Sequence, residues 1–168
     1  TQKTHENNTL EFGLEGAFNY RHQERDFAFS SAGGPFTPIT LPLSSVEVEE
    51  TRYEGFINNS WRVDPTLTLE TGFTYEVSTI SAVAPADNVD RESDFSYPKP
   101  RAVATWTPAK DTQWRFAVER EVAQLDFSEF ASDFDFINNQ TTIGNPNLEP
   151  EQTWKSSLQW KQQLGARG

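Results

Sequence analysis

The 168-residue sequence predicts an all-β chain of about six antiparallel strands. Apolar residues recur at every second position in several segments, which is the period of a strand with one apolar face. Aromatic residues make up 13% of the chain although its mean hydropathy is −0.68, and this argues against a disordered acidic chain. Ten Pro and nine Gly favour strands joined by loops over a mostly helical protein.

The clearest strand is expected at residues 9–21, where apolar and polar residues alternate strictly. Its even positions are Leu10, Phe12, Leu14, Gly16, Phe18 and Tyr20. Polar or small residues occupy the odd positions between them, including Glu11, Glu15 and Asn19. The segment is therefore predicted to have one apolar and one polar face.

Five further strands are expected along the chain. They lie at residues 51–63, 67–77, 101–107, 113–122 and 153–161. The segment 67–77 alternates well, with Leu67, Leu69, Phe73, Tyr75 and Val77 on one face. The segment 51–63 is less regular, because Phe56 and Asn59 interrupt the alternation of Tyr53, Ile57 and Trp61.

The connections between these strands alternate in length. Residues 63–66 and 107–112 form short turns, whereas 21–50, 77–100 and 123–153 are long links. Loops this long are uncommon in compact soluble domains, but short turns on one side and long loops on the other are typical of outer-membrane barrels. No window of 18 apolar residues predicts a transmembrane helix, yet a transmembrane β-strand needs only about 9–11 residues. The fold class predicted is an antiparallel up-and-down transmembrane β-barrel fragment, with short periplasmic turns and long extracellular loops.

Charge follows the same division of the chain. The three long links hold fifteen acidic residues against four basic ones, whereas the remainder has ten of each. The net charge of −11 is thus expected at the loop end. Such an acidic chain has no basic surface that would bind nucleic acid, because its charge would repel the phosphate backbone.

Aromatic residues near the strand ends admit two interpretations. The set is Tyr20, Trp61, Tyr75, Tyr97, Trp106, Trp114, Trp154 and Trp160. In a membrane barrel these rings would form an interfacial girdle. In a secreted, soluble β-sandwich they would pack a core or form a platform for binding carbohydrate. The alternation of loop lengths favours the girdle.

Chemical motifs are few, and no enzyme activity, metal site or cofactor is expected. The absence of Cys excludes thiol catalysis and cysteine metal sites. Glu11 with Glu15, and Glu70 with Glu76, could do acid–base chemistry if a neighbouring strand set the carboxylates at the right separation, but solvated polar faces are commoner. The acidic run 87–94 lacks the glycine and terminal glutamate of a helix-loop-helix calcium site, which favours a solvated loop.

One segment carries a more specific pattern, just before the last expected strand. Residues 144–151 read Gly-Asn-Pro-Asn-Leu-Glu-Pro-Glu, in which two prolines fix an extended entry and the asparagines suit turns. This motif resembles the barrel of TonB-dependent outer-membrane receptors. Its residues are Gly144, Asn145, Pro146, Leu148, Pro150 and Glu151. Segments 53–61, 67–76, 97–108 and 120–127 resemble the same family in the same order, so the resemblance covers about residues 9–163.

The resemblance implies an outer-membrane receptor that takes up a scarce ligand such as a ferric siderophore, cobalamin or an oligosaccharide. It implies a bacterial outer-membrane location, contact with lipid, and energy from the TonB complex acting through a plug domain. Residues 1–168 are expected to be a partial barrel domain, since they contain no plug, no TonB box and no terminal aromatic strand. Candidate ligand contacts are the loop aromatics Phe27, Phe29, Phe127, Phe130, Phe134 and Phe136, although these rings could equally pack on one another. A soluble β-sandwich carbohydrate-binding module is the alternative.

Overall fold

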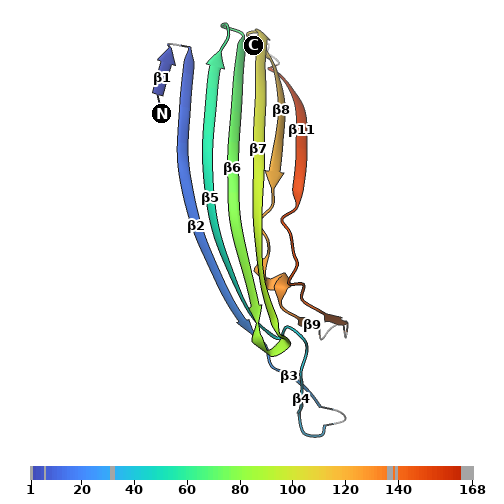
Figure 1. Cartoon of the computed structure of the whole chain (residues 1–168). Helices are drawn as coiled ribbons and strands as arrows, with labels where there is room; N and C mark the ends of the chain where they lie inside the picture. The colour runs from blue at the N-terminus through green and yellow to red at the C-terminus, as the bar shows by residue number, and fades with distance from the viewer. Residues whose placement is uncertain (1, 6, 31–32, 136–137, 139, 164–168) are drawn as a thin grey trace.

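The computed structural model describes residues 2–5, 7–30, 33–135, 138 and 140–163. One antiparallel sheet dominates it, with the strand order β1-β2-β5-β6-β7-β8-β11 (Figure 1). The strands are β1 Gln2–His5, β2 Asn8–Glu24, β5 Ser45–Arg62, β6 Leu67–Ala84, β7 Val89–Ala109, β8 Thr112–Val122 and β11 Gln152–Gln162. The order follows the sequence, and each strand pairs with its neighbours along the chain. The predicted antiparallel up-and-down sheet is confirmed, and the described strands leave it open, with β1 and β11 at its edges.

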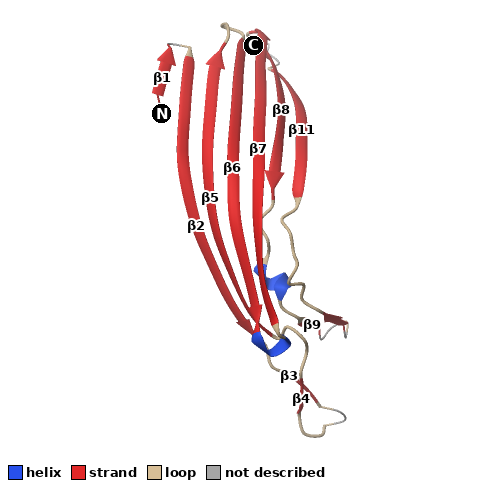
Figure 2. Cartoon of the chain, viewed as in Figure 1, coloured by secondary structure: helices blue, strands red, loops and turns tan. Residues whose placement is uncertain are grey.

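Smaller elements gather at one end of the sheet, which we call the loop end (Figure 2). They are the hairpin β3 Phe27–Phe29 with β4 Thr37–Ile39, the hairpin β9 Asp133–Asp135 with β10 Gln140–Thr142, and the 3-10 turns η1 Pro85–Asp87 and η2 Phe127–Phe130. The opposite end, the turn end, carries the short connections between β5 and β6 and between β7 and β8. In the described part of the chain, no helix is long and apolar enough to cross a membrane.

Strand register separates the sheet into two faces, because directly paired residues point to the same side. Phe12, Ile57 and Phe73 form one row across β2, β5 and β6, and they belong to what we call the outer face. Rows of polar residues alternate with such apolar rows and form the inner face. Large apolar side chains on the outer face are exposed, as Leu14 is at 90%. This half-apolar pattern is the one predicted for strands with one face in lipid.

Phe56 interrupts the predicted alternation because it lies on the inner face opposite a glycine. The register pairs Phe56 with Gly13 across β2 and β5. A Cβ atom added to Gly13 would lie 2.5 Å from the Phe56 ring. The Phe56 ring therefore covers the backbone of β2. The absence of a side chain at Gly13 leaves the space that this inward-facing ring occupies.

The apolar positions change faces toward the loop end, and this overturns the predicted long loop at 77–100. β6 continues to Ala84 and β7 begins at Val89, so residues 85–88 alone connect them. Beyond Val77 the buried residues of β6 are Ser78, Ile80, Ala82 and Ala84, which lie on the inner face. The prediction assumed that apolar residues stay on the odd positions of β6. It therefore ended the strand at Val77, where the apolar residues move to the even positions.

The other two long links are also shorter than predicted. β2 runs on to Glu24 and β5 starts at Ser45, so the predicted loop 21–50 shrinks to residues 25–44. The link after β8 spans residues 123–151 and contains η2 and the β9–β10 hairpin. The strands β5, β6 and β7 are thus longer than the roughly 9–11 residues that cross a bilayer, and they extend past it toward the loops.

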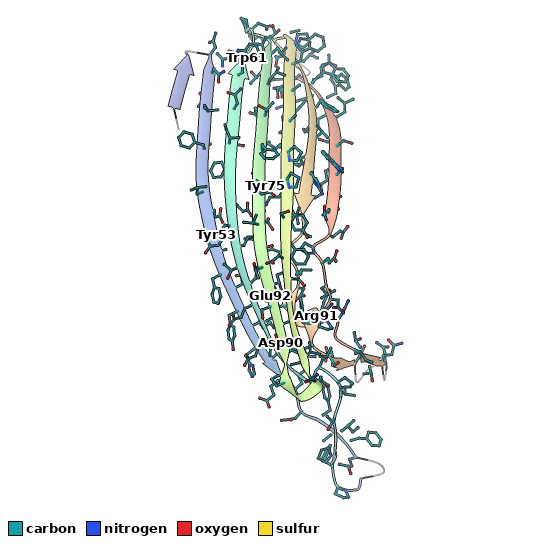
Figure 3. The ribbon with its side chains drawn as sticks, in the orientation of Figure 1. Tyr53, Trp61, Tyr75, Asp90, Arg91 and Glu92 are labelled. Atoms are coloured by element: carbon teal, nitrogen blue, oxygen red, sulfur yellow. The ribbon has the colours of Figure 1, made fainter. Side chains whose placement is uncertain are left out.

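Tryptophans form a row on the outer face at the turn end. Trp106 pairs with Trp114, and Trp114 pairs with Trp160, whose ring centroid lies 6.0 Å away. Trp61 lies at the same end, with Tyr53 and Tyr75 nearer the loops (Figure 3). Eight residues separate Trp61 from Tyr53, about 27 Å along a strand. A strand tilt of about 40° reduces this to about 20 Å, close to the apolar band of membrane barrels.

Tyr97 does not belong to this girdle, contrary to the sequence interpretation. Its register pairs it with Glu76, and its side chain is buried on the inner face. Tyr20 and Trp154 do lie exposed on the outer face. The tryptophans, Tyr20, Tyr53 and Tyr75 thus share the outer face, whereas Tyr97 packs inward beside Phe95, at a centroid distance of 6.0 Å.

We expect the stacked pair Trp114–Trp160 to stabilise the turn end beyond the effect of burying each ring alone. Aromatic pairs contribute about 0.5–1.5 kcal/mol in double-mutant cycles. Trp114→Ala and Trp160→Ala, made singly and together in the intact protein, should give a coupling energy in this range in urea unfolding from lipid vesicles. Trp61→Ala with Trp160→Ala is the matched control and should be additive, because these two rings lie on strands that are not neighbours.

The turn between β5 and β6 is closed by Asp64. Its Oδ1 atom accepts hydrogen bonds from Thr66 N at 2.7 Å, Thr66 Oγ1 at 2.7 Å and Leu67 N at 3.0 Å. The hydrogen bond from the Thr66 side chain, followed by those from the backbone, holds the pKa of Asp64 below its ordinary value of 3.8. The predicted tight turn at 63–66 is therefore held by an aspartate side chain as well as by Pro65.

This turn should lose stability in acid. A carboxylate whose pKa is lower in the folded than in the unfolded chain stabilises the fold above its unfolded value, and this contribution disappears as pH falls through the folded pKa. We expect the difference in unfolding free energy between the natural protein and Asp64→Ala to be constant above about pH 5 and to shrink below about pH 4. Urea titrations between pH 3 and 7 measure it, and a difference that grows toward acid pH would contradict it.

Candidate ligand-binding groove

The loops pack onto the inner face of the sheet at the loop end and form a small apolar core. Val46 and Val48 of β5 and Ile80, Ala82 and Ala84 of β6 line the sheet side. Leu43, Phe130 and Ala131 cover them from the loops, and Phe130 is 1% exposed. We call this cluster the cap core. It fixes the link 123–151 against strands β5 and β6, although that link leaves the sheet at β8.

The motif at residues 144–151 joins the loops to one another. Gly144 is buried against the backbone of η2, and its N–H donates to Ser132 Oγ at 3.1 Å. The Ser132 hydroxyl donates in turn to Pro42 O, and Ser132 N donates to Leu43 O at 3.0 Å. The link between β8 and β11 is thereby tied to the link between β2 and β5.

The remaining motif residues shape the entry to β11. Asn145 Oδ1 accepts from Asn147 N at 2.9 Å, which is the turn expected for an asparagine. Asn147 Oδ1 then accepts from Arg91 Nη2 at 2.5 Å. Leu148 packs on the cap core and Pro150 is buried. Pro146 is half-buried, and Glu151 O accepts from Ala123 N at 2.8 Å, which closes the base of the link.

A groove of about 700 Å³ lies between this link and the inner side of β2 and β5. It is lined by Asn19, Tyr20, Arg21, Glu50, Gln124, Leu125, Asp126 and Phe127. Asn19 pairs with Glu50 in the β2–β5 register, and Asn19 Nδ2 donates to Glu50 Oε2 at 2.7 Å. The volume falls within the range of small-molecule sites, about 300–1,000 Å³.

Two carboxylates and one guanidinium set the charge of the groove. Glu50 is buried, at 7% exposed. Asp126 begins η2, and its Oδ1 accepts from Ser128 N at 2.8 Å and Ser128 Oγ at 2.6 Å. The hydrogen bond from the Ser128 side chain is the main cause that holds the pKa of Asp126 below its ordinary value. Asp126 therefore stays ionised, and the formal charges of Asp126, Glu50 and Arg21 sum to −1.

The loop phenylalanines proposed as ligand contacts occupy different surroundings. Phe127 lines the groove and also packs on the cap core. Phe130 is buried beneath it in an edge-to-face contact, with ring centroids 6.0 Å apart. Phe27 is half-buried and Phe29 is exposed, both in the β3–β4 hairpin. The side chain of Phe134 and all of Phe136 lie outside the described residues. The sequence did not single out four other residues that line the groove, Asn19, Arg21, Glu50 and Gln124. Their segments showed only the alternation of an ordinary strand or the composition of an ordinary loop.

Polar residues of the inner face form ion pairs rather than a catalytic pair. Lys99 Nζ lies 2.8 Å from Glu76 Oε2 and 3.0 Å from Glu54 Oε1. Arg101 lies 3.9 Å from Glu70 and 3.5 Å from Glu119. Glu70 and Glu76 are thus engaged by cations of β7, which supports the hypothesis of a polar wall over acid–base chemistry.

The acidic run 87–94 is not a solvated loop. Asp90, Glu92 and Asp94 alternate along the outer side of β7, at the loop end of the sheet (Figure 3). Asp87 accepts from Leu43 N at 2.8 Å through its Oδ2 atom. Nowhere in the described part of the chain do three or more His, Cys, Asp or Glu residues gather in a way that could hold a metal ion.

Comparison with known proteins identifies the family. The family model described as TonB dependent receptor-like, beta-barrel matches residues 1–167. Searches among curated proteins and among solved structures found no match. The match spans nearly the whole chain, and the antiparallel sheet, the outer aromatic row and the polar inner face agree with it. The chain therefore belongs to the TonB-dependent receptor-like β-barrel family, whose members are outer-membrane receptors and transporters and not enzymes.

Proposed function

We propose that this chain forms part of the wall and the extracellular loops of a receptor that takes up a scarce ligand across the bacterial outer membrane. The candidate ligands are a ferric siderophore, cobalamin or an oligosaccharide. Uptake is driven by the TonB complex, which acts on a plug domain that residues 1–168 do not contain. The outer face of the sheet contacts lipid, and the groove beside the cap core takes part in capturing ligand.

The observation that carries this proposal is the division of one sheet into three zones. The outer face between Trp61 and Tyr53 carries mostly large apolar side chains, and the inner face at the same level carries ion pairs. Toward the loops the two faces exchange character, so the outer face becomes acidic and the inner face is covered by loops. A membrane barrel with a projecting extracellular rim accounts for all three zones.

The soluble β-sandwich alternative is not supported. Within residues 2–163, as far as they are described, no second sheet covers the outer face, and its large apolar side chains remain exposed. A sandwich needs two sheets packed about 10 Å apart to bury such a face. Lipid is the medium in which this face is stable.

Fractionation and uptake test the proposal together. We expect the intact receptor to sediment with the outer membrane, to require detergent for extraction, and to migrate faster on unheated than on heated gels. Uptake of its ligand should stop when the proton-motive force is dissipated or the inner-membrane TonB complex is deleted. Recovery of the protein as a monodisperse soluble species without detergent would contradict the proposal.

A further inference from the structure

The groove beside the cap core has few free cations, and this bears on what it can bind. Toward the loop end lie Arg21, Arg25 and Arg91, and two of these three are engaged by the protein. Arg25 pairs with Asp133, and Arg91 donates to Asn147. Arg21 is the third, and it lines the groove together with Glu50 and Asp126. Anions are recognised by clusters of arginine and lysine, and no such cluster lines this groove.

The charge around the groove opposes an anionic ligand. The groove itself sums to −1, and the segments that form the loop end carry fifteen acidic residues. Long-range fields of this sign lower the local concentration of anions and slow their association. Ferric chelates with a net negative charge, and phosphorylated ligands, are therefore disfavoured here.

The polar groups of the groove favour a ligand rich in hydroxyl groups. Asn19 and Gln124 supply amides that both donate and accept, while Glu50 and Asp126 accept. A buried carboxylate such as Glu50, with one oxygen bound to Asn19, retains acceptor capacity for a hydroxyl donor. On the same inner face of β2, two residues beyond Arg21, Gln23 has both amide atoms buried without a partner. Unsatisfied buried amides are commonly bound by water or ligand.

Phe127 supplies an apolar ring whose orientation is fixed before ligand arrives. Its ring packs edge-to-face on Phe130, which the cap core holds at 1% exposed. An immobilised ring loses little entropy on binding, and one aromatic face beside several planar polar groups matches the alternating apolar and polar faces of a sugar ring. A cobalamin-sized ligand would need a larger apolar lining than Leu125 and Phe127 provide.

We propose that this groove binds a neutral oligosaccharide, with Phe127 stacked on one sugar ring and Asn19, Glu50, Gln124 and Asp126 bound to its hydroxyl groups. The inference rests on the proposed function and names the ligand class for the same site. It selects the glycan from the three classes that the family resemblance left open. Arg21 lines the same groove beside these two carboxylates and does not serve as an anion anchor.

The test is binding by the intact receptor in detergent. Three probe sets are used: an array of neutral oligosaccharides, a panel of anionic ferric chelates, and cyanocobalamin. We expect retention of at least one neutral glycan, followed by calorimetry of that glycan. Phe127→Leu, which keeps apolar volume but removes the ring, and Glu50→Gln should each weaken its binding at least tenfold. Phe36→Leu is the matched control, because Phe36 is an exposed loop phenylalanine away from the groove, and it should change affinity less than twofold.

The outcomes separate the inference from the proposed function. Binding and TonB-dependent uptake of a ferric chelate, weakened by Arg21→Ala, would overturn the inference and leave the receptor function standing. Glycan binding that Phe127→Leu and Glu50→Gln do not change would overturn this groove as the site. A protein outside the outer membrane that binds none of the probes would overturn both. Unheated gel migration checks that each variant is folded.

Discussion

Gly144→Ala is expected to release the link 123–151 from the sheet while the barrel wall stays folded. A Cβ atom at this position would lie 2.2 Å from Phe130 O and 2.6 Å from Phe130 C, which are backbone atoms that no rotamer change can move. The link must therefore shift away from η2. That shift breaks the hydrogen bonds from Gly144 N to Ser132 Oγ and from Asn145 N to Glu129 O.

The expected cost is about 3–5 kcal/mol in the local opening of this link, from overpacking and the two lost hydrogen bonds. At 1.4 kcal/mol for each factor of ten, hydrogen exchange within residues 123–151 should accelerate at least about a hundredfold. Exchange in the paired segments of β5 and β6 near the turn end should not change. The loss of a fixed Phe127 should also weaken ligand capture.

Gly16→Ala is the matched control for a glycine in this protein. The nearest atom to an added Cβ there is Tyr53 Cδ1 at 3.4 Å, which is ordinary contact. We expect this variant to leave exchange in the link unchanged. If Gly144→Ala behaves like Gly16→Ala, the motif glycine does not hold the link against η2.

The membrane-facing part of the fold follows from the sequence because one physical rule governs it. Lipid favours apolar side chains on the outer face, so the alternation of Leu10, Phe12 and Leu14 gives both the strand and its face. The short turns were equally predictable, since Pro65 and Asp64 carry turn chemistry in the sequence itself. Register across strands follows once the turns are fixed.

The loop end was predicted poorly because the apolar side chains of the strands move there from the outer face to the inner face. Ile80, Ala82 and Ala84 alternate as well as the residues before them, but on even rather than odd positions. Which phase faces the loops depends on Phe130 and Leu43, which are distant in sequence. A search for any alternation of period two, without a fixed phase, would have found β6 to its end.

The groove could not be predicted from one sequence. Asn19 and Glu50 meet through register, but Phe127 reaches them because the link after β8 folds back across the inner face. No local pattern states the direction in which a loop folds. The motif at 144–151 was visible in the sequence, whereas its role in joining the loops depends on the backbone of η2.

Lys99→Met is expected to produce the largest loss of stability in the barrel wall. The register places Glu15, Glu54 and Glu76 in one row on three adjacent strands, and Lys99 contacts two of these carboxylates. The Lys99 and Glu76 side chains are only 18% and 7% exposed. Like charges directly across a sheet are destabilising, and Arg52, at 3.5 Å from Glu54, would be the remaining cation in contact with the row.

We expect a loss of about 3 kcal/mol in urea unfolding of the intact receptor in lipid vesicles, because removing one partner leaves partly buried carboxylates without compensation. Lys99→Arg should restore most of it. The double variant Lys99→Met with Glu76→Gln should be more stable than Lys99→Met alone, with a coupling energy of about 1–3 kcal/mol.

Lys155→Met is the matched control. It shows whether the loss of stability expected for Lys99→Met arises from the glutamate row or from removing any lysine of the barrel wall. Lys155 pairs with Glu121 on the same inner face, but its side chain is 58% exposed and the pair is screened by water. Its removal should cost less than about 1 kcal/mol. Equal losses for Lys99→Met and Lys155→Met, with no recovery on adding Glu76→Gln, would mean that the glutamate row does not depend on Lys99. A large difference with recovery would mean that three acidic strands pair side by side because one lysine of β7 neutralises them.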